Sequence, residues 1–320
     1  MEKDILNFPS QFSYQPEIIN ENNLRRRSNI IVLGMGGSHL AAGLLKSWDN
    51  HCSILIHWDY GLPAISDEQL ADSLIIAISH SGKTEEILSG LAAAQKKGLT
   101  PAVISSGGPL ITEAKNASLP YIQIPADGLQ PRLALGFMLK SLLKLAGFDE
   151  KLTATEKLVN LTPTDWQKPG QALAEKLAGK IPIIYASPEN GALAYNWKIK
   201  FNETGKVPAF YNLLPELNHN EMNGFAAGQT KVLSSNFAFL LLADEEDRPE
   251  IKKRLAVLTQ VLTAGGHSVT TLPLTGKNRL FRLFNSLLYA DWTTYYTALA
   301  YGQEPAAVPL IEEFKRQMAE

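Results

Sequence analysis

The chain is poor in the features that mark several classes of protein. Cys52 is the only cysteine among 320 residues, which excludes an internal disulfide and a metal site built from several cysteines. No apolar run is long enough to span a bilayer, and the first residues, MEKDILNFPSQF, lack the basic flank and apolar core of a signal peptide. These absences fit a reducing compartment, and we expect a cytoplasmic protein without a membrane anchor.

The chain also lacks a net charge of any size. Its 30 basic and 32 acidic residues leave a formal net charge of −2, so no overall field would hold a nucleic acid or a membrane surface. The basic cluster LRRRS at residues 24–28 has no interleaved aromatic residues and is typical of a solvated face. We therefore expect no nucleic acid and no membrane as partner, whereas a small anion remains a candidate ligand.

The composition is that of an ordinary folded protein. Hydrophobic residues make up 45% of the chain and charged residues 19%, which is enough apolar surface for more than one core. Because 320 residues exceed one average domain, we expect two domains with separate cores.

Short apolar runs alternate with helical segments in the first half of the chain. The expected strands lie in NIIVLGMGGS, SILIHW, SLIIAIS, PAVIS and YIQIP. Helical spacing follows the first run in HLAAGLLKSW and recurs over residues 83–97 and 132–146. Strands that are apolar throughout and alternate with helices predict a parallel sheet covered on both faces.

A second series of similar plan follows. The segment GFDEKLTATEKLVNLTPTDWQKPG interrupts the alternation and is the expected boundary. KIPIIYAS, FAFLLLAD and HSVTTLPL then predict strands, with helices over 192–203, 249–264, 281–301 and 306–318. The sequence thus predicts an α/β protein with domains at 1–152 and 153–320, each a parallel sheet between helices in a Rossmann-like, flavodoxin-type arrangement.

The glycine turn GMGGS, residues 34–38, lies where the first strand ends and a helix begins. Open α/β sheets bind ligands here, because glycines let the backbone approach a phosphate and the helix N-terminus offers free N–H groups. A turn needed only for tight packing would use the same glycines, but binding is the favoured interpretation. A dinucleotide site is disfavoured although Asp59 ends the next strand, because His39 replaces the third glycine of G-x-G-x-x-G.

The next such junction, SLIIAISHSGKTEE, carries the hydroxyls of Ser79, Ser81 and Thr84. Hydroxyls beside a helix N-terminus suit a phosphate monoester, and helix capping alone needs only one of them. A nucleotide P-loop is the rival, since residues 77–84 match G-x-x-x-x-G-K-T except at Ala77. Because Ala77 lies inside the apolar run, the remaining loop is too short to wrap nucleotide phosphates.

Arg132 follows a proline at the start of a helix in DGLQPRLALG. An arginine there can hold a phosphate or a developing oxyanion, although an isolated arginine is more often a surface charge. The histidines show no paired spacing of metal ligands, so we expect neither a metal nor a cofactor.

The stretch NETGKVPAFYNLLPELNHNEMNGF, residues 202–225, gathers proton carriers among several asparagines: Glu203, Lys206, Glu216, His219 and Glu221. A polar turn with capping residues accounts for only part of this set. A carboxylate and an imidazole can divide two proton-transfer roles near neutral pH, which favours an active site.

Nearly the whole chain resembles the bifunctional phosphoglucose/phosphomannose isomerase family, which is built from two sugar isomerase (SIS) domains. The resemblance rests on the order and spacing of GMGGS, SHSGKTEE, QPR.ALG, NET.KVPAF.NLLPELNHNE..GF and the closing LIEEFK. The PELNHNE block is highly specific, whereas the glycine turn and S-x-S-G-x-T occur in all SIS proteins. The resemblance implies interconversion of glucose 6-phosphate, and of mannose 6-phosphate, with fructose 6-phosphate through a cis-enediol.

The resemblance also implies a role for each matched residue. Glu203 would be the base that moves a proton between C1 and C2, and Arg132 would stabilise the enediolate. His219 would open the sugar ring with Lys315 beside it, and in this family the histidine comes from the partner subunit of a homodimer with shared active sites. The substrate phosphate would be held by Gly36, Gly37, Ser38, Ser79, Ser81 and Thr84.

Some positions depart from the family's pattern. Relatives usually have glycine at His39, tyrosine or another residue at His80, and asparagine at Lys83, so the phosphate affinity can differ. The segment EPAAVP also lacks the threonine that many relatives carry before the final helix, a difference that bears on the mannose reaction.

Two other functions stay open. SIS domains also serve as non-catalytic sugar-phosphate sensors, but sensors commonly carry a DNA-binding domain and have no use for the Glu203, His219 and Lys315 set. An amino-sugar phosphate isomerase, such as half of a glucosamine 6-phosphate synthase, would need a glutaminase partner with a nucleophilic cysteine, and Cys52 lies in a segment that leads into a buried strand.

Overall fold

The structure, a computed structural model, describes residues 1–125, 128–226 and 231–318. The chain divides into two compact units. The N-terminal unit comprises Asn7–Leu161, and the C-terminal unit comprises Met1–Leu6 together with Thr162–Glu320.

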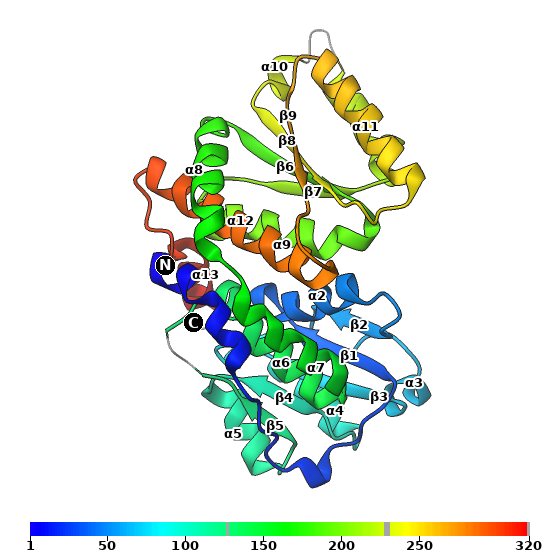
Figure 1. Ribbon diagram of the computed structural model, residues 1–320. Helices are drawn as coiled ribbons and strands as arrows, with labels where there is room; N and C mark the ends of the chain where they lie inside the picture. The colour runs from blue at the N-terminus through cyan, green and yellow to red at the C-terminus, as the bar shows by residue number, and fades with distance from the viewer. Residues whose placement is uncertain (126–127, 227–230, 319–320) are drawn as a thin grey trace. The chain divides into compact units, whose positions relative to one another are not determined.

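The N-terminal unit is built on a five-stranded parallel sheet in the order β2-β1-β3-β4-β5 (Figure 1). Its register pairs Val32 of β1 with Ile56 of β2 on one side and with Ile76 of β3 on the other. The chain leaves β1 for β2 and then returns past β1 to β3, so the direction of winding reverses between β1 and β3. Open α/β sheets form their ligand crevice at such a switch point. The strands are β1 (Asn29–Gly34), β2 (Ile54–His57), β3 (Ser73–Ile78), β4 (Ala102–Ser105) and β5 (Tyr121–Gln123).

Helices cover both faces of this sheet. Successive side chains of a strand point to opposite faces, so strands that are apolar throughout must be buried on both. Ile31 and Leu33 pack into one core with side chains of α4 (Glu85–Lys96) and α5 (Gly108–Asn116). Leu70 of α3 (Asp67–Ala71) belongs to the same core. The remaining helices of this unit are α2 (Leu40–Trp48) and α6 (Leu135–Ala146), which contact each other, and α7 (Asp149–Glu156).

The C-terminal unit repeats the plan with four parallel strands in the order β7-β6-β8-β9. Ile183 and Tyr185 of β6 share a core with Leu258 and Leu262 of the helix that follows β8. The strands are β6 (Ile181–Ala186), β7 (Phe210–Leu213), β8 (Phe237–Ala243) and β9 (Ser268–Pro273). The helices are α1 (Glu2–Leu6), α8 (Gln167–Lys176), α9 (Gly191–Glu203), α10 (Lys231–Ser234), α11 (Pro249–Ala264), α12 (Arg279–Ala300) and α13 (Pro309–Met318).

Two helices of this unit approach each other closely. Gly170 of α8 faces α12, where a Cβ at position 170 would lie 2.5 Å from the Cβ of Trp292. The N-terminal helix α1 also packs on α12, with the Tyr295 hydroxyl donating to a Glu2 carboxylate oxygen at 3.3 Å. The first six residues therefore belong to the C-terminal unit although they begin the chain.

The α/β class and the parallel sheets between helices are confirmed, and α11 begins and ends at the predicted residues. Strand β7 was not predicted, because its sequence FYNL lies in the polar stretch 202–225 and the strand is partly exposed at the sheet edge. The segment expected to be a boundary contains α7 and the start of α8, and the chain passes from one compact unit to the other within it, between Leu161 and Thr162. The domain limits 1–152 and 153–320 stay a prediction.

Candidate active site

The glycine turn lies at the switch point of the N-terminal unit, directly after β1. Gly36 has a φ of +49°, a left-handed conformation that favours glycine. A Cβ at Gly37 would lie 2.8 Å from the Cβ of Pro131 and 3.0 Å from the backbone nitrogen of Arg132. Gly37 therefore permits the segment that carries Arg132 to contact the turn, although the two are about 95 residues apart in the sequence.

Arg132 is buried, with 1% of its surface exposed, so the alternative of a surface charge is wrong. One guanidinium nitrogen donates a hydrogen bond to the Gln130 side-chain oxygen at 3.4 Å. A buried guanidinium can stabilise a negative charge more strongly than one in water, because the local dielectric constant is lower.

The predicted hydroxyls lie in the loop after β3. The Ser79 and Thr84 hydroxyl oxygens are 2.8 Å apart, and the Ser79 hydroxyl also accepts a hydrogen bond from Gly82 N at 3.1 Å. Gly82 has a φ of +67°, and a Cβ there would lie 1.9 Å from the carbonyl oxygen of Gly107. The Ser81 hydroxyl accepts from Lys83 N at 3.3 Å, on an exposed part of the loop. Three hydroxyls thus lie in one short turn before α4.

Hydrogen bonds join this loop to its neighbours. The backbone N–H of His80 donates to the Ser38 hydroxyl at 3.1 Å, which links the glycine turn after β1 to the loop after β3. The His80 carbonyl accepts hydrogen bonds from the backbone N–H of Ser106 at 3.0 Å and from its hydroxyl at 2.6 Å. These bonds join the loop after β4 to the loop after β3. The structure therefore brings together the predicted phosphate-binding residues of the N-terminal unit: Gly36, Gly37, Ser38, Ser79, Ser81 and Thr84.

These loops offer N–H and O–H donors at the N-termini of α2 and α4, which is the arrangement that binds phosphate groups. Strand β3 continues to Ile78, so Ala77 belongs to the strand and the loop is shorter than a nucleotide P-loop.

Burial lowers the pKa of His39 to about 4 and also lowers the pKa of His80. Both imidazoles are therefore neutral near pH 7 and add no positive charge to these loops.

In the C-terminal unit, Glu203 is the last residue of α9 and is half-buried. The chain turns sharply after it: Lys206 has a φ of +56°, and its ammonium group donates to the Glu203 carbonyl and, at 3.2 Å, to that of Pro305. The Asn202 side chain donates to the Val207 carbonyl at 3.0 Å. These bonds hold the end of α9 in one geometry and so restrict the position of the Glu203 carboxylate.

His219 is exposed and lies between two 3₁₀ turns, Glu216–Asn218 and Glu221–Phe225. Leu217 before it is fully buried, and Glu221 after it is held by two hydrogen bonds. The predicted histidine is therefore a solvent-facing side chain on an anchored segment.

Glu203 and His219 lie at opposite edges of the C-terminal sheet. Helix α9 starts after the carboxyl end of β6 and runs back over 13 residues, which at about 1.5 Å per residue places Glu203 about 20 Å from that edge. His219 follows the carboxyl end of β7, which is parallel to β6. Lys315 is exposed on a third element, α13. One C-terminal unit does not bring this carboxylate and this imidazole together.

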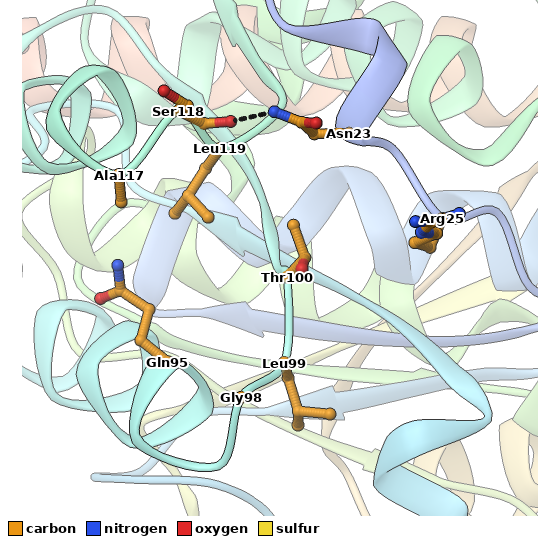
Figure 2. A pocket seen from close by; sticks show the side chains of 9 residues that line it. All are labelled: Asn23, Arg25, Gln95, Gly98, Leu99, Thr100, Ala117, Ser118 and Leu119. Carbon is orange, nitrogen blue, oxygen red and sulfur yellow. Dashed lines mark hydrogen bonds between the residues drawn. The ribbon is translucent and has the colours of Figure 1, made fainter.

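A cavity of about 350 Å³ lies at the other edge of the N-terminal sheet, at the amino ends of its strands (Figure 2). Figure 2 shows the Asn23 side chain donating to the Ser118 carbonyl, a bond of 2.8 Å. A second cavity of about 220 Å³ shares Arg25, Gly98, Leu99 and Thr100 with it. Helices α4 and α5 end here, and the carbonyls of a helix C-terminus disfavour anions. We therefore expect the sugar phosphate to bind at the opposite edge of this sheet.

Within residues 1–125, 128–226 and 231–318, no group of three or more His, Cys, Asp and Glu side chains is arranged to hold a metal ion. None of the helices in those ranges combines the length and apolar character needed to cross a membrane.

Comparison with known proteins assigns the chain to a family. Residues 166–318 match the profile described as the bacterial phospho-glucose isomerase C-terminal SIS domain. A bifunctional phosphoglucose/phosphomannose isomerase of Aquifex aeolicus is 33% identical over 99% of this chain and 97% of its own. The chain belongs to the bifunctional phosphoglucose/phosphomannose isomerase family.

Other relatives agree with this assignment. An isomerase of the same name from Caldicellulosiruptor bescii is 31% identical over 100% of this chain and 99% of its own. A crystal structure of a hypothetical protein from Thermus thermophilus has a TM-score of 0.69, with 18% identity, 99% of this chain covered and 87% of that chain. At this identity the structural similarity supports the fold alone. The predicted family is confirmed by the relatives of full length.

Proposed function

We propose that this protein is an aldose-ketose isomerase that interconverts glucose 6-phosphate, and also mannose 6-phosphate, with fructose 6-phosphate. The observation that carries the proposal is a match of 33% identity, over nearly the whole chain, to a bifunctional isomerase. A cluster of four hydroxyls at the N-terminal switch point, here called the hydroxyl cradle, supports the proposal, because all three substrates share a phosphate monoester. The four hydroxyls are those of Ser38, Ser79, Ser81 and Thr84.

The N-terminal unit would bind that phosphate. The backbone N–H groups of the glycine turn and the hydroxyls of the β3–α4 loop donate to the phosphate oxygens, and the hydrogen bonds among these loops hold the donors in place before the substrate arrives. The residues assigned to this role are Gly36, Gly37, Ser38, Ser79, Ser81 and Thr84.

The isomerisation is a proton transfer between adjacent carbons. In the open-chain aldose, Glu203 takes the proton from C2, and the electron pair forms the C1–C2 double bond of a cis-enediol as negative charge develops on O1. Arg132 stabilises that charge. Return of the proton to C1, with transfer of the O2 hydroxyl proton to O1, gives fructose 6-phosphate. Its return to C2 from the other face, as the O1 charge re-forms the aldehyde, gives the epimeric aldose.

The cyclic sugar must open first. Ring opening breaks the bond between C1 and the ring oxygen, removes the proton from the O1 hydroxyl and places a proton on the ring oxygen. His219 is assigned this exchange, with Lys315 beside it. Since Glu203 and His219 lie at opposite edges of one sheet, we propose that each active site takes His219 from a second copy of the chain in a homodimer.

A coupled assay tests the function. Purified protein should convert glucose 6-phosphate and mannose 6-phosphate to fructose 6-phosphate and leave glucosamine 6-phosphate unchanged. Turnover of the amino sugar would instead support the amino-sugar enzyme, and tight binding of all three without turnover would support a sugar-phosphate sensor. We propose that the reaction belongs to glycolysis and gluconeogenesis, because both pathways exchange glucose 6-phosphate with fructose 6-phosphate. We also propose that it takes place in the cytoplasm.

A further inference from the structure

Glu221, two residues after His219, bonds to two neighbouring strands. Its carboxylate accepts a hydrogen bond from the Tyr185 hydroxyl at 2.5 Å and another from the Asn212 side-chain amide. Tyr185 lies on the central strand β6 and is 1% exposed, whereas Asn212 lies on the edge strand β7. The carboxylate therefore joins the segment that carries His219 to the sheet itself.

Tyr185 and Asn212 both act as hydrogen-bond donors toward the Glu221 carboxylate. Burial, followed by the hydrogen bond and the charge of Glu221, raises the pKa of Tyr185, so this hydroxyl keeps its proton and donates it. The Asn212 amide is also oriented, because its oxygen accepts a hydrogen bond from Leu213 N at 2.8 Å and its nitrogen must then face Glu221. Position 221 consequently needs a side chain with two acceptor oxygens, one for each donor. A carboxylate has two such oxygens, whereas an amide has one.

The anchors lie on both sides of the exposed histidine. Leu217, two residues before it, is fully buried in a core cluster that also contains Tyr185. After Glu221, Phe225 packs against the same cluster and its carbonyl is 2.8 Å from a ring nitrogen of His267. His219 lies between Leu217 and Glu221, in the part of the segment that faces solvent.

We propose that Glu221 is a positioning residue for His219: by joining Tyr185 and Asn212, it holds the imidazole in the orientation that ring opening requires. This inference rests on the proposed function, in which His219 exchanges protons with the sugar ring. Glu221 acts through the shape of the segment and has no contact with the reacting atoms. Its loss impairs the ring-opening step and spares phosphate binding.

Ring opening can be measured apart from isomerisation. Opening, rotation about C1–C2 and closure exchange the α and β anomers of glucose 6-phosphate without any proton transfer at C2. Magnetisation-transfer NMR gives this exchange rate above the spontaneous one, and a coupled assay gives isomerisation. Glu203→Gln should lose isomerisation and keep anomer exchange, whereas a variant that displaces His219 should lose both.

The decisive variant is Glu221→Gln. It replaces one carboxylate oxygen with an amide N–H₂ group, so either the Tyr185 hydroxyl or the Asn212 amide loses its acceptor. We expect enzymatic anomer exchange and kcat for isomerisation to fall about 10- to 100-fold, as for other small misplacements of a catalytic group. The affinity for a phosphorylated sugar acid should stay within about twofold of the parent. In the His219→Ala background, Glu221→Gln should lower anomer exchange by no more than about twofold, because the group that it positions is gone.

Glu216→Gln is the matched control. Glu216 precedes His219 by three residues and is exposed, and its carboxylate oxygen accepts one hydrogen bond from Asn220 at 2.8 Å, which a glutamine oxygen can also accept. We expect this variant to keep the parent's rates. Tyr185→Phe provides a second test, since it removes one donor and leaves the buried ring, and it should lower anomer exchange in the same direction.

The outcomes separate the two proposals. Parent-like anomer exchange in folded Glu221→Gln and Tyr185→Phe overturns the positioning role, while an active parent leaves the proposed function standing. A further loss in the His219→Ala background of the same size as in the parent also overturns it, because the effect would then bypass His219. A parent protein that neither exchanges anomers nor isomerises overturns the proposed function itself.

Discussion

The hydroxyl oxygens of Ser79 and Thr84 lie 2.8 Å apart across the turn that joins β3 to α4. Ser79 directly follows the buried strand β3 and Thr84 is the residue before the first turn of α4, so the contact joins the end of the strand to the helix N-terminus. The Ser79 hydroxyl also accepts a hydrogen bond from Gly82 N. These hydrogen bonds hold the two hydroxyls in place, which lowers the entropic cost of binding a phosphate.

Removing the two more accessible hydroxyls of the cradle should weaken binding of a sugar phosphate. For Ser81→Ala combined with Thr84→Ala, we expect about 1.5 to 3 kcal/mol per lost hydrogen bond to the charged phosphate. The pH dependence of turnover should not change, because neither hydroxyl serves the reacting carbons. Calorimetric titration with a phosphorylated sugar acid measures the loss, with Thr112→Ala on the exposed face of α5 as control. An unchanged dissociation constant places the phosphate elsewhere.

The two left-handed glycines of the site should differ in their tolerance of a side chain. Gly82→Ala puts a Cβ 1.9 Å from the Gly107 carbonyl oxygen, whereas at Gly36 no atom of the described residues beyond its two chain neighbours lies within 4 Å of the added Cβ. We expect Gly36→Ala to cost only the backbone strain of about 1 to 2 kcal/mol, and Gly82→Ala to cost more than about 4 kcal/mol. Urea unfolding measures both, and equal losses would contradict the close approach of the two loops.

Mixing two inactive variants should restore activity if the active site is shared. Glu203→Gln should lower kcat by about 10²- to 10⁴-fold, the usual contribution of a general base, with binding of a sugar phosphate retained. His219→Ala should also be inactive. Each mixed dimer then has one site with both groups intact, so heterodimers isolated with two different tags should form fructose 6-phosphate. Confirmed heterodimers without activity would show that both groups come from one chain.

Acid should destabilise the N-terminal unit through His39. Burial lowers the pKa of its ring from 6.5 to about 4 in the folded protein. As the pH falls, the unfolded chain therefore takes up this proton before the folded chain does. The stabilisation is complete above the unfolded-state pKa and is lost as the pH falls from that value to the folded-state pKa.

The magnitude follows from this linkage. Between about pH 7 and about pH 5, His39 should account for about 2 kcal/mol of lost stability. Urea unfolding at the two pH values should show a smaller loss for His39→Gln than for the parent, by that amount. His51→Gln, at an exposed histidine of the same unit, should behave as the parent does. A parent-like loss in His39→Gln would contradict the role of burial.

The sequence alone determined the class of the fold and most of its elements. Apolar runs of strand length and the helical spacing between them are local patterns, so the predicted strands, and α11 with both of its ends, agree with the structure. Strand β7 escaped prediction because it is short, lies within a stretch rich in polar residues and is at the edge of its sheet. The motif residues were found for a different reason, since their spacing matches a known family.

Only the tertiary structure decided which of these residues meet. Nothing local shows that Arg132 is buried against Gly37, or that Glu221 reaches Tyr185 on another strand, because sheet order and helix packing depend on both faces of a whole unit. The same holds for Glu203 and His219: they are 16 positions apart in the sequence, yet a helix and a parallel strand carry them to opposite edges of one sheet. Strand β7 lies between these two residues and carries the chain from one edge of the sheet to the other, so their separation in space is a property of the fold.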